Sequence, residues 1–306
     1  MVLLHRMSTF DLRKARLSDL IDMWFKAHGH TLKDSRYRVA RLHAMSQRMG
    51  NPLLRKFSTS MFANYRADRI GEVSTSTVNH ELRYLRAVFN EMDRLGFYEV
   101  INPLKKIRQF KEMEREMGFL ESYQIPILLE ACEDSRNKQL TTVAKICLST
   151  GSRFGEAEYL TRNELIGGER PCLRFVNTKN GRIRAVPISQ AMYNEIHAIS
   201  NNKTDRRFFS NCRTAFRKAA DRSGIEFPKG QKTHMLRHTF ASHFMMNGGD
   251  ILTLQKVLGH SDLKMTLRYS HLSPDYLTKV LELNPLINCK VPDRAKVVGL
   301  FEGLSF

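Results

Sequence analysis

The apolar positions in the first hundred residues recur at helical spacing. In residues 17–25 they fall every three or four positions: Leu17, Leu20, Ile21, Trp24 and Phe25. A second amphipathic run covers residues 78–92, and two helical stretches between these runs end at Gly50 and Gly71. The pattern predicts an all-helical N-terminal unit.

The composition changes after this helical unit. Asn102-Pro103 ends the last helix, because a residue that precedes proline is biased away from the helical region. The following stretch, residues 104–118, is charged and has few core positions, as is typical of a linker. We therefore place a boundary near residue 110. It separates a first domain over residues 1–110 from a second over residues 111–285, with a C-terminal tail over residues 286–306.

The second domain mixes helices with one strand pair. Residues 172–178 and 182–189 are β-favouring runs joined across Asn180-Gly181, a dipeptide that tolerates the positive φ angles of a type I′ turn. This pairing places Lys179 at the tip of a hairpin. Helical patterns cover the rest of the domain, at about 122–133, 138–149, 212–223, 234–247, 251–258 (with Asp250 as N-cap) and 263–270. The predicted fold is mainly α, with a small antiparallel β-sheet.

The charge balance points to a polyanionic partner. The 306 residues include 49 Lys and Arg against 31 Asp and Glu, a net charge of +18. Nucleic acid is the first expectation and an acidic membrane surface the second. There is no apolar run of eighteen residues and no secretory leader, which favours a cytosolic protein. The five cysteines are scattered and never form C-x-x-C, so we expect reduced thiols and no zinc site.

Four places in the second domain carry side chains suited to a phosphate. They are Arg153 with Glu156 in TGSRFGE, Lys179 in TKNGRIR, His234 with Arg237 in HMLRH, and His260 with Tyr269 in LGHSDLKMTLRYSH. Each has a plain alternative when taken alone: a surface ion pair, a solvated lysine, a chance H-x-x-R, and a half-buried core tyrosine. Together they offer planar guanidinium groups for the phosphate oxygens, neutral hydrogen-bond donors beside them and an acid for the leaving oxygen. A metal site is the weaker interpretation, because the H-x-x-x-H at 234 and 238 lacks the zincin glutamate.

The order and spacing of these residues resemble the tyrosine recombinases, or phage integrases. The matching motifs are T-G-x-R-x-x-E, H-x-L-R-H-T-F-A-S, L-G-H, and a tyrosine nine residues after that histidine. The resemblance runs from about residue 17 to 285 and is closest to integrases of temperate phages of the enterobacterial type. It implies a helical core DNA-binding domain over residues 1–110 and a catalytic domain with the family's fold over residues 111–285, which close around double-stranded DNA.

The resemblance also implies a mechanism. Tyr269 would attack the scissile phosphodiester and leave a 3′-phosphotyrosyl bond and a free 5′-hydroxyl. Arg153 and Arg237 would neutralise the phosphate, so neither a metal nor another cofactor is expected. His234 and His260 would donate hydrogen bonds to the phosphate or help to deprotonate the tyrosine.

Lys179, with a catalytic role, and Glu156, with a supporting one, complete the implied set. Lys179 is the candidate general acid for the 5′-oxygen, carried there by its hairpin. Glu156 is expected to orient Arg153 or its helix, because a carboxylate beside a phosphate would repel it.

The predicted function is site-specific recombination that integrates or excises a phage or mobile element in the bacterial cytoplasm, on the nucleoid. The resemblance implies a homo-tetramer on synapsed DNA, with residues 286–306 as a candidate tail that packs in trans, and possible DNA-bending accessory proteins. About sixteen residues precede the first helix. We therefore do not expect the arm-binding domain of many phage integrases here, whether by nature or by truncation. The alternatives are a non-catalytic DNA-binding relative and a type IB topoisomerase-like relaxing enzyme.

Overall fold

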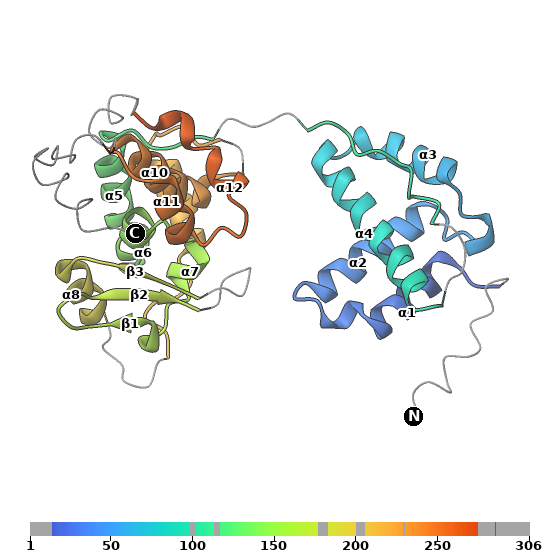
Figure 1. Ribbon diagram of the computed structural model, residues 1–306, viewed down its shortest axis with the longest axis horizontal. Coiled ribbons are helices and arrows are strands. Elements are labelled where there is room, and N and C mark those ends of the chain that lie inside the picture. The colour runs from blue at the N-terminus through green and yellow to red at the C-terminus, as the bar shows by residue number, and fades with distance from the viewer. Residues whose placement is uncertain are drawn as a thin grey trace, which may run out of the picture. The chain divides into compact units, whose positions relative to one another are not determined.

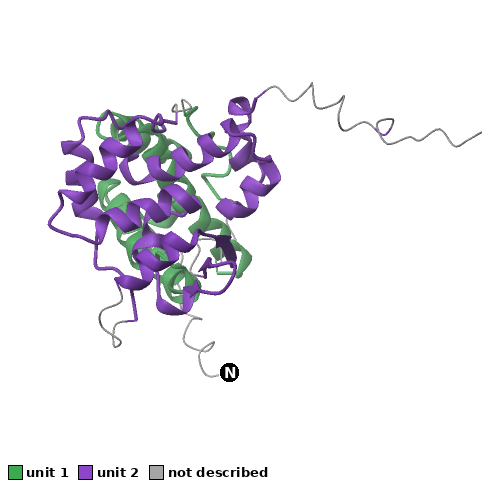
Figure 2. Ribbon diagram, turned by 90° about the vertical axis from the view of Figure 1, so that its left-hand side faces the viewer, with its two compact units in different colours: residues 1–115 green, residues 116–306 purple. Residues whose placement is uncertain are grey.

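The computed structural model describes residues 14–97, 102–112, 117–176, 183–199, 206–228, 230–274 and 285. The chain divides into two compact units, residues 1–115 and 116–306 (Figure 2). Among the helices that these residues form, none combines the length and the apolar character needed to span a bilayer.

In the part of unit 1 that the structure describes, four α-helices form a bundle. They are α1 (Leu17–Ala27), α2 (Ser35–Arg48), α3 (Thr59–Ile70) and α4 (Thr75–Arg94), with short 3₁₀ turns η2 (Gly29–Thr31) and η3 (Leu54–Lys56). Ser58 is the N-cap of α3 and Ser74 is the N-cap of α4. Each side chain accepts a hydrogen bond from the backbone N–H three residues later. Trp24, Phe62 and Phe89 lie in the core, as expected for an all-helical unit.

The charged stretch after α4 is attached to unit 1. Leu104 is fully buried in the core of that unit, and the side-chain amide of Asn79 on α4 pairs with both backbone polar groups of Phe110, at 3.0 and 2.9 Å. Arg86 and Arg66 donate to the backbone oxygens of Ile107 and Arg108. Residues 102–112 therefore pack against α4, although their composition had indicated a linker with few core positions.

Unit 2 is mainly helical, with one small sheet. Its helices are α5 (Gln124–Glu133), α6 (Leu140–Thr150), α7 (Phe154–Glu158), α8 (Gln190–Ala198), α9 (Arg213–Arg222), α10 (Lys232–Met246), α11 (Ile251–Leu258) and α12 (Lys264–Leu267), with 3₁₀ turns η4 (Arg162–Glu164) and η5 (Ser270–Leu272). The predicted fold class is confirmed. The sequence patterns had not predicted α7 or α8.

The sheet has three antiparallel strands in the order β1-β2-β3: β1 (Leu165–Ile166), β2 (Cys172–Phe175) and β3 (Arg184–Pro187). The predicted strand pair is present, and β1 adds a short edge. The turn at Asn180-Gly181, with Lys179, lies outside the described residues. In Figure 1 the sheet lies at the bottom of unit 2, below α5, α6, α10 and α11.

Helix α10 runs through the middle of unit 2. It packs against α6, α7, α9 and α11, so its side chains are buried in several directions. The helices around it end in sharp turns. Gly151 ends α6 with φ 62° and Gly259 ends α11 with φ 67°, the left-handed conformation that glycine adopts at little cost. These two turns bring backbone carbonyl oxygens against one side of α10.

Candidate active site

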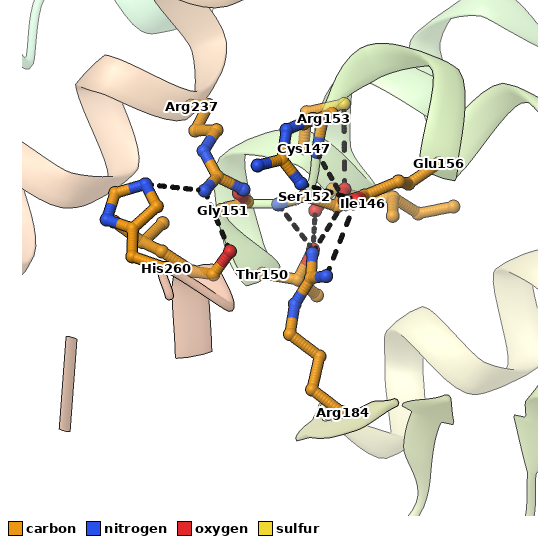
Figure 3. A network of polar contacts seen from close by, with 11 residues as sticks. Ile146, Cys147, Thr150, Gly151, Ser152, Arg153, Glu156, Arg184, Arg237 and His260 are labelled. Atoms are coloured by element: carbon orange, nitrogen blue, oxygen red, sulfur yellow. Dashed lines mark hydrogen bonds and ion pairs between the residues drawn. The ribbon is translucent and has the colours of Figure 1, made fainter. Parts of the chain in front are cut away.

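Arg237 on α10 is held by these two helix ends. Its guanidinium donates to the carbonyl oxygen of Gly151 at 2.9 Å and to that of Leu258 at 2.7 Å (Figure 3). It also lies 2.9 Å from Nε2 of His260. Burial, assisted by the charge of Arg153, lowers the pKa of Arg237 to about 10, so the guanidinium stays protonated at neutral pH. The site thus contains a fixed, nearly buried positive charge.

The contacts of His260 determine its tautomer. Arginine has donors and no acceptor, so Nε2 of His260 accepts the hydrogen bond from Arg237. The ring proton then lies on Nδ1, which donates to Oγ1 of Thr266 at 2.9 Å. Burial lowers the pKa of His260 to about 4, and the nearby charges of Arg237 and Arg153 act in the same direction. His260 is therefore neutral near pH 7.

Glu156 joins two arginines in front of α7. Its carboxylate accepts from the backbone N–H of Arg153 at 2.9 Å and from the Arg153 guanidinium at 2.8 Å. It also pairs with Arg184 of β3 at 2.6 Å (Figure 3). Burial alone would raise the pKa of Glu156, but the hydrogen bonds and charges of Arg184 and Arg153 hold it below the usual value. The carboxylate stays ionised and can position Arg153, the role predicted for it.

Tyr269 follows α12 and is buried, with 2% of its surface exposed. Its hydroxyl lies 2.6 Å from Nδ1 of His238 on α10. Burial raises the pKa of the phenol, and the charges of Arg237 and Arg268 offset part of that increase. The tyrosine of the DNA-free protein is therefore protonated and enclosed, and its partner His238 is the residue after Arg237 on α10.

The structure brings together most of the residues predicted for the site. Arg153, Glu156, Arg237 and His260 belong to one polar network, and Tyr269 is joined to α10 through His238. His234 is exposed on the same helix, with its ring centroid 6.4 Å from that of His238. Lys179 lies outside the described residues.

Three side chains of the network were not predicted from the sequence. Arg184 is a buried cation above the ring of Phe175, and its inward position could have been inferred from the alternation along β3, where Val186 is also buried. Thr266 and His238 orient His260 and Tyr269. No spacing rule identifies them, because their partners are distant in sequence or lie across a loop. In the ranges that the structure describes, no three metal-ligating side chains form a cluster.

Comparisons with known proteins define the class of this protein. The profile described as "Phage integrase family" matches residues 118–275, and that described as "Phage integrase, N-terminal domain" matches residues 13–111. The integrase of Escherichia phage 186 is 47% identical over 282 residues, which cover 89% of this chain and 82% of that protein. The chain therefore belongs to the phage integrase family and is a site-specific DNA recombinase.

Solved structures share the fold of this chain. The catalytic domain of bacteriophage HP1 integrase is 44% identical, with a TM-score of 0.52, and the match covers 56% of this chain and 98% of that one. A lambda integrase tetramer bound to a Holliday junction is 18% identical, with a TM-score of 0.69, and the match covers 89% of this chain and 81% of that one. This second likeness shows a shared fold across both units.

Proposed function

We propose that this recombinase cleaves DNA by attack of the Tyr269 hydroxyl on the scissile phosphodiester, with Arg153 and Arg237 as ligands of the phosphate. The observation that carries this assignment is the placement of Tyr269. Its hydroxyl contacts the residue next to Arg237 on α10, so one chain supplies both the nucleophile and a fixed guanidinium. Two arginines can stabilise the negative charge that develops on the non-bridging oxygens.

The remaining predicted residues complete the proposal. His234 donates a hydrogen bond to the phosphate, and Lys179 protonates the leaving 5′-oxygen. Both ring nitrogens of His260 are occupied by Arg237 and Thr266, so this histidine holds the Arg237 guanidinium in place. Glu156 is a positioning residue, since its carboxylate is occupied by two arginines and its contacts place the Arg153 guanidinium. The bond energy of the phosphodiester is retained in a 3′-phosphotyrosyl ester, so religation needs no nucleotide.

The same chemistry requires two DNA duplexes and several protomers. We propose that four copies of this chain assemble on synapsed double-stranded DNA and integrate or excise a phage or other mobile element, in the bacterial cytoplasm. Support comes from the shared fold with the lambda integrase tetramer. Packing of residues 286–306 in trans and help from DNA-bending accessory proteins belong to the same proposal, as do the assignments of residues 1–110 to core-site binding and 111–285 to catalysis.

The test of the assignment is covalent trapping on a nicked suicide substrate built from the attachment-site DNA. Wild-type protein should form an adduct that survives a denaturing gel. Tyr269→Phe should bind the same DNA in a gel-shift assay and form no adduct, because the phenylalanine ring has no nucleophilic oxygen. An adduct with the Tyr269→Phe protein would show that another residue attacks the DNA.

A further inference from the structure

His238 is the histidine that contacts the reacting oxygen of the proposed nucleophile. Its Nδ1 lies 2.6 Å from Oη of Tyr269, and the two ring centroids are 6.0 Å apart. This distance is at the short end of the range for a hydrogen bond to a hydroxyl. His238 follows Arg237 on α10, so a rigid helix connects the contact on the tyrosine with the guanidinium.

The other two histidines of the site are placed differently. Both ring nitrogens of His260 are occupied, because Nε2 accepts from Arg237 and Nδ1 donates to Thr266. His260 therefore has no lone pair available for the proton of Tyr269. His234 is exposed one helical turn before His238. Among the described residues, His234 is thus placed where it can bind phosphate, whereas His238 contacts the nucleophile.

The surroundings of His238 keep its ring neutral. Burial lowers its pKa to about 4, and the nearby charges of His234, Arg268 and Arg237 act in the same direction. A neutral imidazole with its proton on Nε2 has a lone pair on Nδ1. In that tautomer the Tyr269 hydroxyl donates and Nδ1 accepts, which aims the phenolic proton at the histidine.

We propose that His238 is a catalytic residue, the proton acceptor for Tyr269 during attack on the phosphodiester. This inference rests on the proposed role of Tyr269. As the bond between Oη and phosphorus forms, the proton moves from Oη to Nδ1, and the bond between phosphorus and the 5′-oxygen breaks. The 5′-oxygen takes its proton from a separate acid. In religation the imidazolium returns its proton to the departing tyrosine oxygen, and the histidine becomes neutral again.

The timing of the transfer follows from the two pKa values. The buried phenol is a weaker acid than usual and the buried imidazole a weaker base, so the proton stays on Tyr269 in the resting protein. Bond formation to phosphorus makes the phenolic oxygen much more acidic. The proton therefore moves in the transition state, where a positioned base contributes about 10²–10⁴-fold in rate.

Two substitutions separate proton acceptance from positioning. His238→Asn retains an amide oxygen near the place of Nδ1, which can accept a hydrogen bond but cannot take a proton at neutral pH. His238→Ala removes both functions. Adduct formation on the suicide substrate should fall by about 10²-fold or more in both variants at pH 7. Asparagine activity within about threefold of wild type, with alanine far lower, would reduce His238 to a positioning residue and overturn the proposal.

A pH series and a modified substrate add readouts that a loss of packing would not change. The deficit of His238→Asn should narrow as the pH rises from about 7 to about 9, because a growing fraction of the phenol ionises without a base. Replacing the bridging 5′-oxygen by sulfur gives a leaving group that needs no protonation. That substrate should restore adduct formation by a variant that lacks the general acid. It should not restore adduct formation by His238→Asn. Rescue by sulfur, or a deficit that is constant with pH, would count against proton acceptance by His238.

Controls distinguish failure of this inference from failure of the proposed function. His243→Asn changes another half-buried histidine on α10, which contacts the backbone oxygen of Leu120, and it should form adduct at close to the wild-type rate. Thermal unfolding should show that all variants are folded. With Tyr269→Phe inactive, a His238→Asn protein of wild-type activity overturns this inference alone. An active Tyr269→Phe protein overturns the assignment on which it rests.

Discussion

At the scale of single residues, the chemistry of the site depends on the hydrogen-bond partner of each polar atom. Arg237 uses its donors on two backbone carbonyls and His260, and this arrangement determines the tautomer of the histidine. Glu156 shares its carboxylate between Arg153 and Arg184. Sequence spacing identified most of these side chains, whereas their protonation states follow from contacts between residues far apart in the chain.

Replacement of Arg153 by alanine should impair cleavage much more than binding. One preorganised donor to a developing charge contributes about 10²–10³ in rate. We therefore expect adduct formation by Arg153→Ala to fall by at least that factor. DNA affinity should fall only a few-fold, because many other Lys and Arg side chains are available to the DNA phosphate backbone. Single-turnover cleavage and gel-shift titration measure the two effects. Arg136→Ala removes an exposed charge outside the network and should cleave normally.

Acidification should destabilise unit 2 through His260. The pKa of His260 is about 4 in the folded protein, against an ordinary value of 6.5, so the unfolded chain binds the proton more readily between these values. The stabilisation is complete above about pH 6.5 and is lost as the pH falls towards 4. Urea unfolding at several pH values should show a loss of about 3 kcal/mol from this group. The pKa of His238 is also about 4, so His260→Gln should reduce that slope and leave the part that is due to His238. An unchanged slope would contradict the assigned cause.

At the scale of elements, the turn from α6 to α7 builds the phosphate side of the site. Gly151 ends α6 in the left-handed conformation, and its carbonyl oxygen binds Arg237. Two residues later, Arg153 is the N-cap of α7 and is held by Glu156 in the first turn. Helix α7 has five residues and no amphipathic repeat, which explains why periodicity did not predict it. The glycine and the motif around it were visible in the sequence, but the short helix was not.

Gly151→Ala should therefore damage both stability and activity. A Cβ at this position would lie 2.4 Å from Phe240 and 2.8 Å from Leu258, in addition to the unfavourable positive φ. We expect a loss of about 2–5 kcal/mol in the free energy of unfolding and a large loss of adduct formation, because Arg237 would lose its support. Denaturant unfolding measures the loss of stability, and cleavage of the suicide substrate measures the loss of adduct formation.

Gly224 provides the matched control for Gly151. It has φ 67° in the same unit, with nothing within 4 Å of its Cβ position. Gly224→Ala should cost about 1–2 kcal/mol from the backbone alone and leave cleavage intact. Equal losses in the two variants would show that contact with Phe240 and Leu258 is unimportant.

At the scale of the whole molecule, the excess of basic residues is the property that suits both units to DNA. The net charge is +18, and both predicted domains contain more Lys and Arg than Asp and Glu. Phosphate contacts of this kind hold DNA without reading its sequence. Affinity is therefore expected to depend on counterion release, and catalysis on the small network in unit 2.

DNA binding should weaken steeply with salt. A protein that makes about six to ten phosphate contacts loses about 10³–10⁵ in affinity between 50 and 200 mM salt. Fluorescence anisotropy with labelled attachment-site DNA should give a linear plot of log affinity against log salt. Its slope should correspond to that loss of affinity between 50 and 200 mM salt. Tyr269→Phe, which keeps every charge, should have the same slope. A nearly flat plot would show that the charge is not used for binding.

The sequence by itself determined the helical class, the central strand pair and most helix ends, and it predicted candidate residues for the site. Those features depend on local periodicity, capping and turn residues, as Asp250 illustrates by capping α11 through the N–H of Thr253. Tertiary structure decided that Arg184 shares Glu156, that Thr266 orients His260 and that His238 contacts Tyr269. These contacts join residues on different elements, and local pattern carries no information on which side chains of separate elements come within hydrogen-bonding distance.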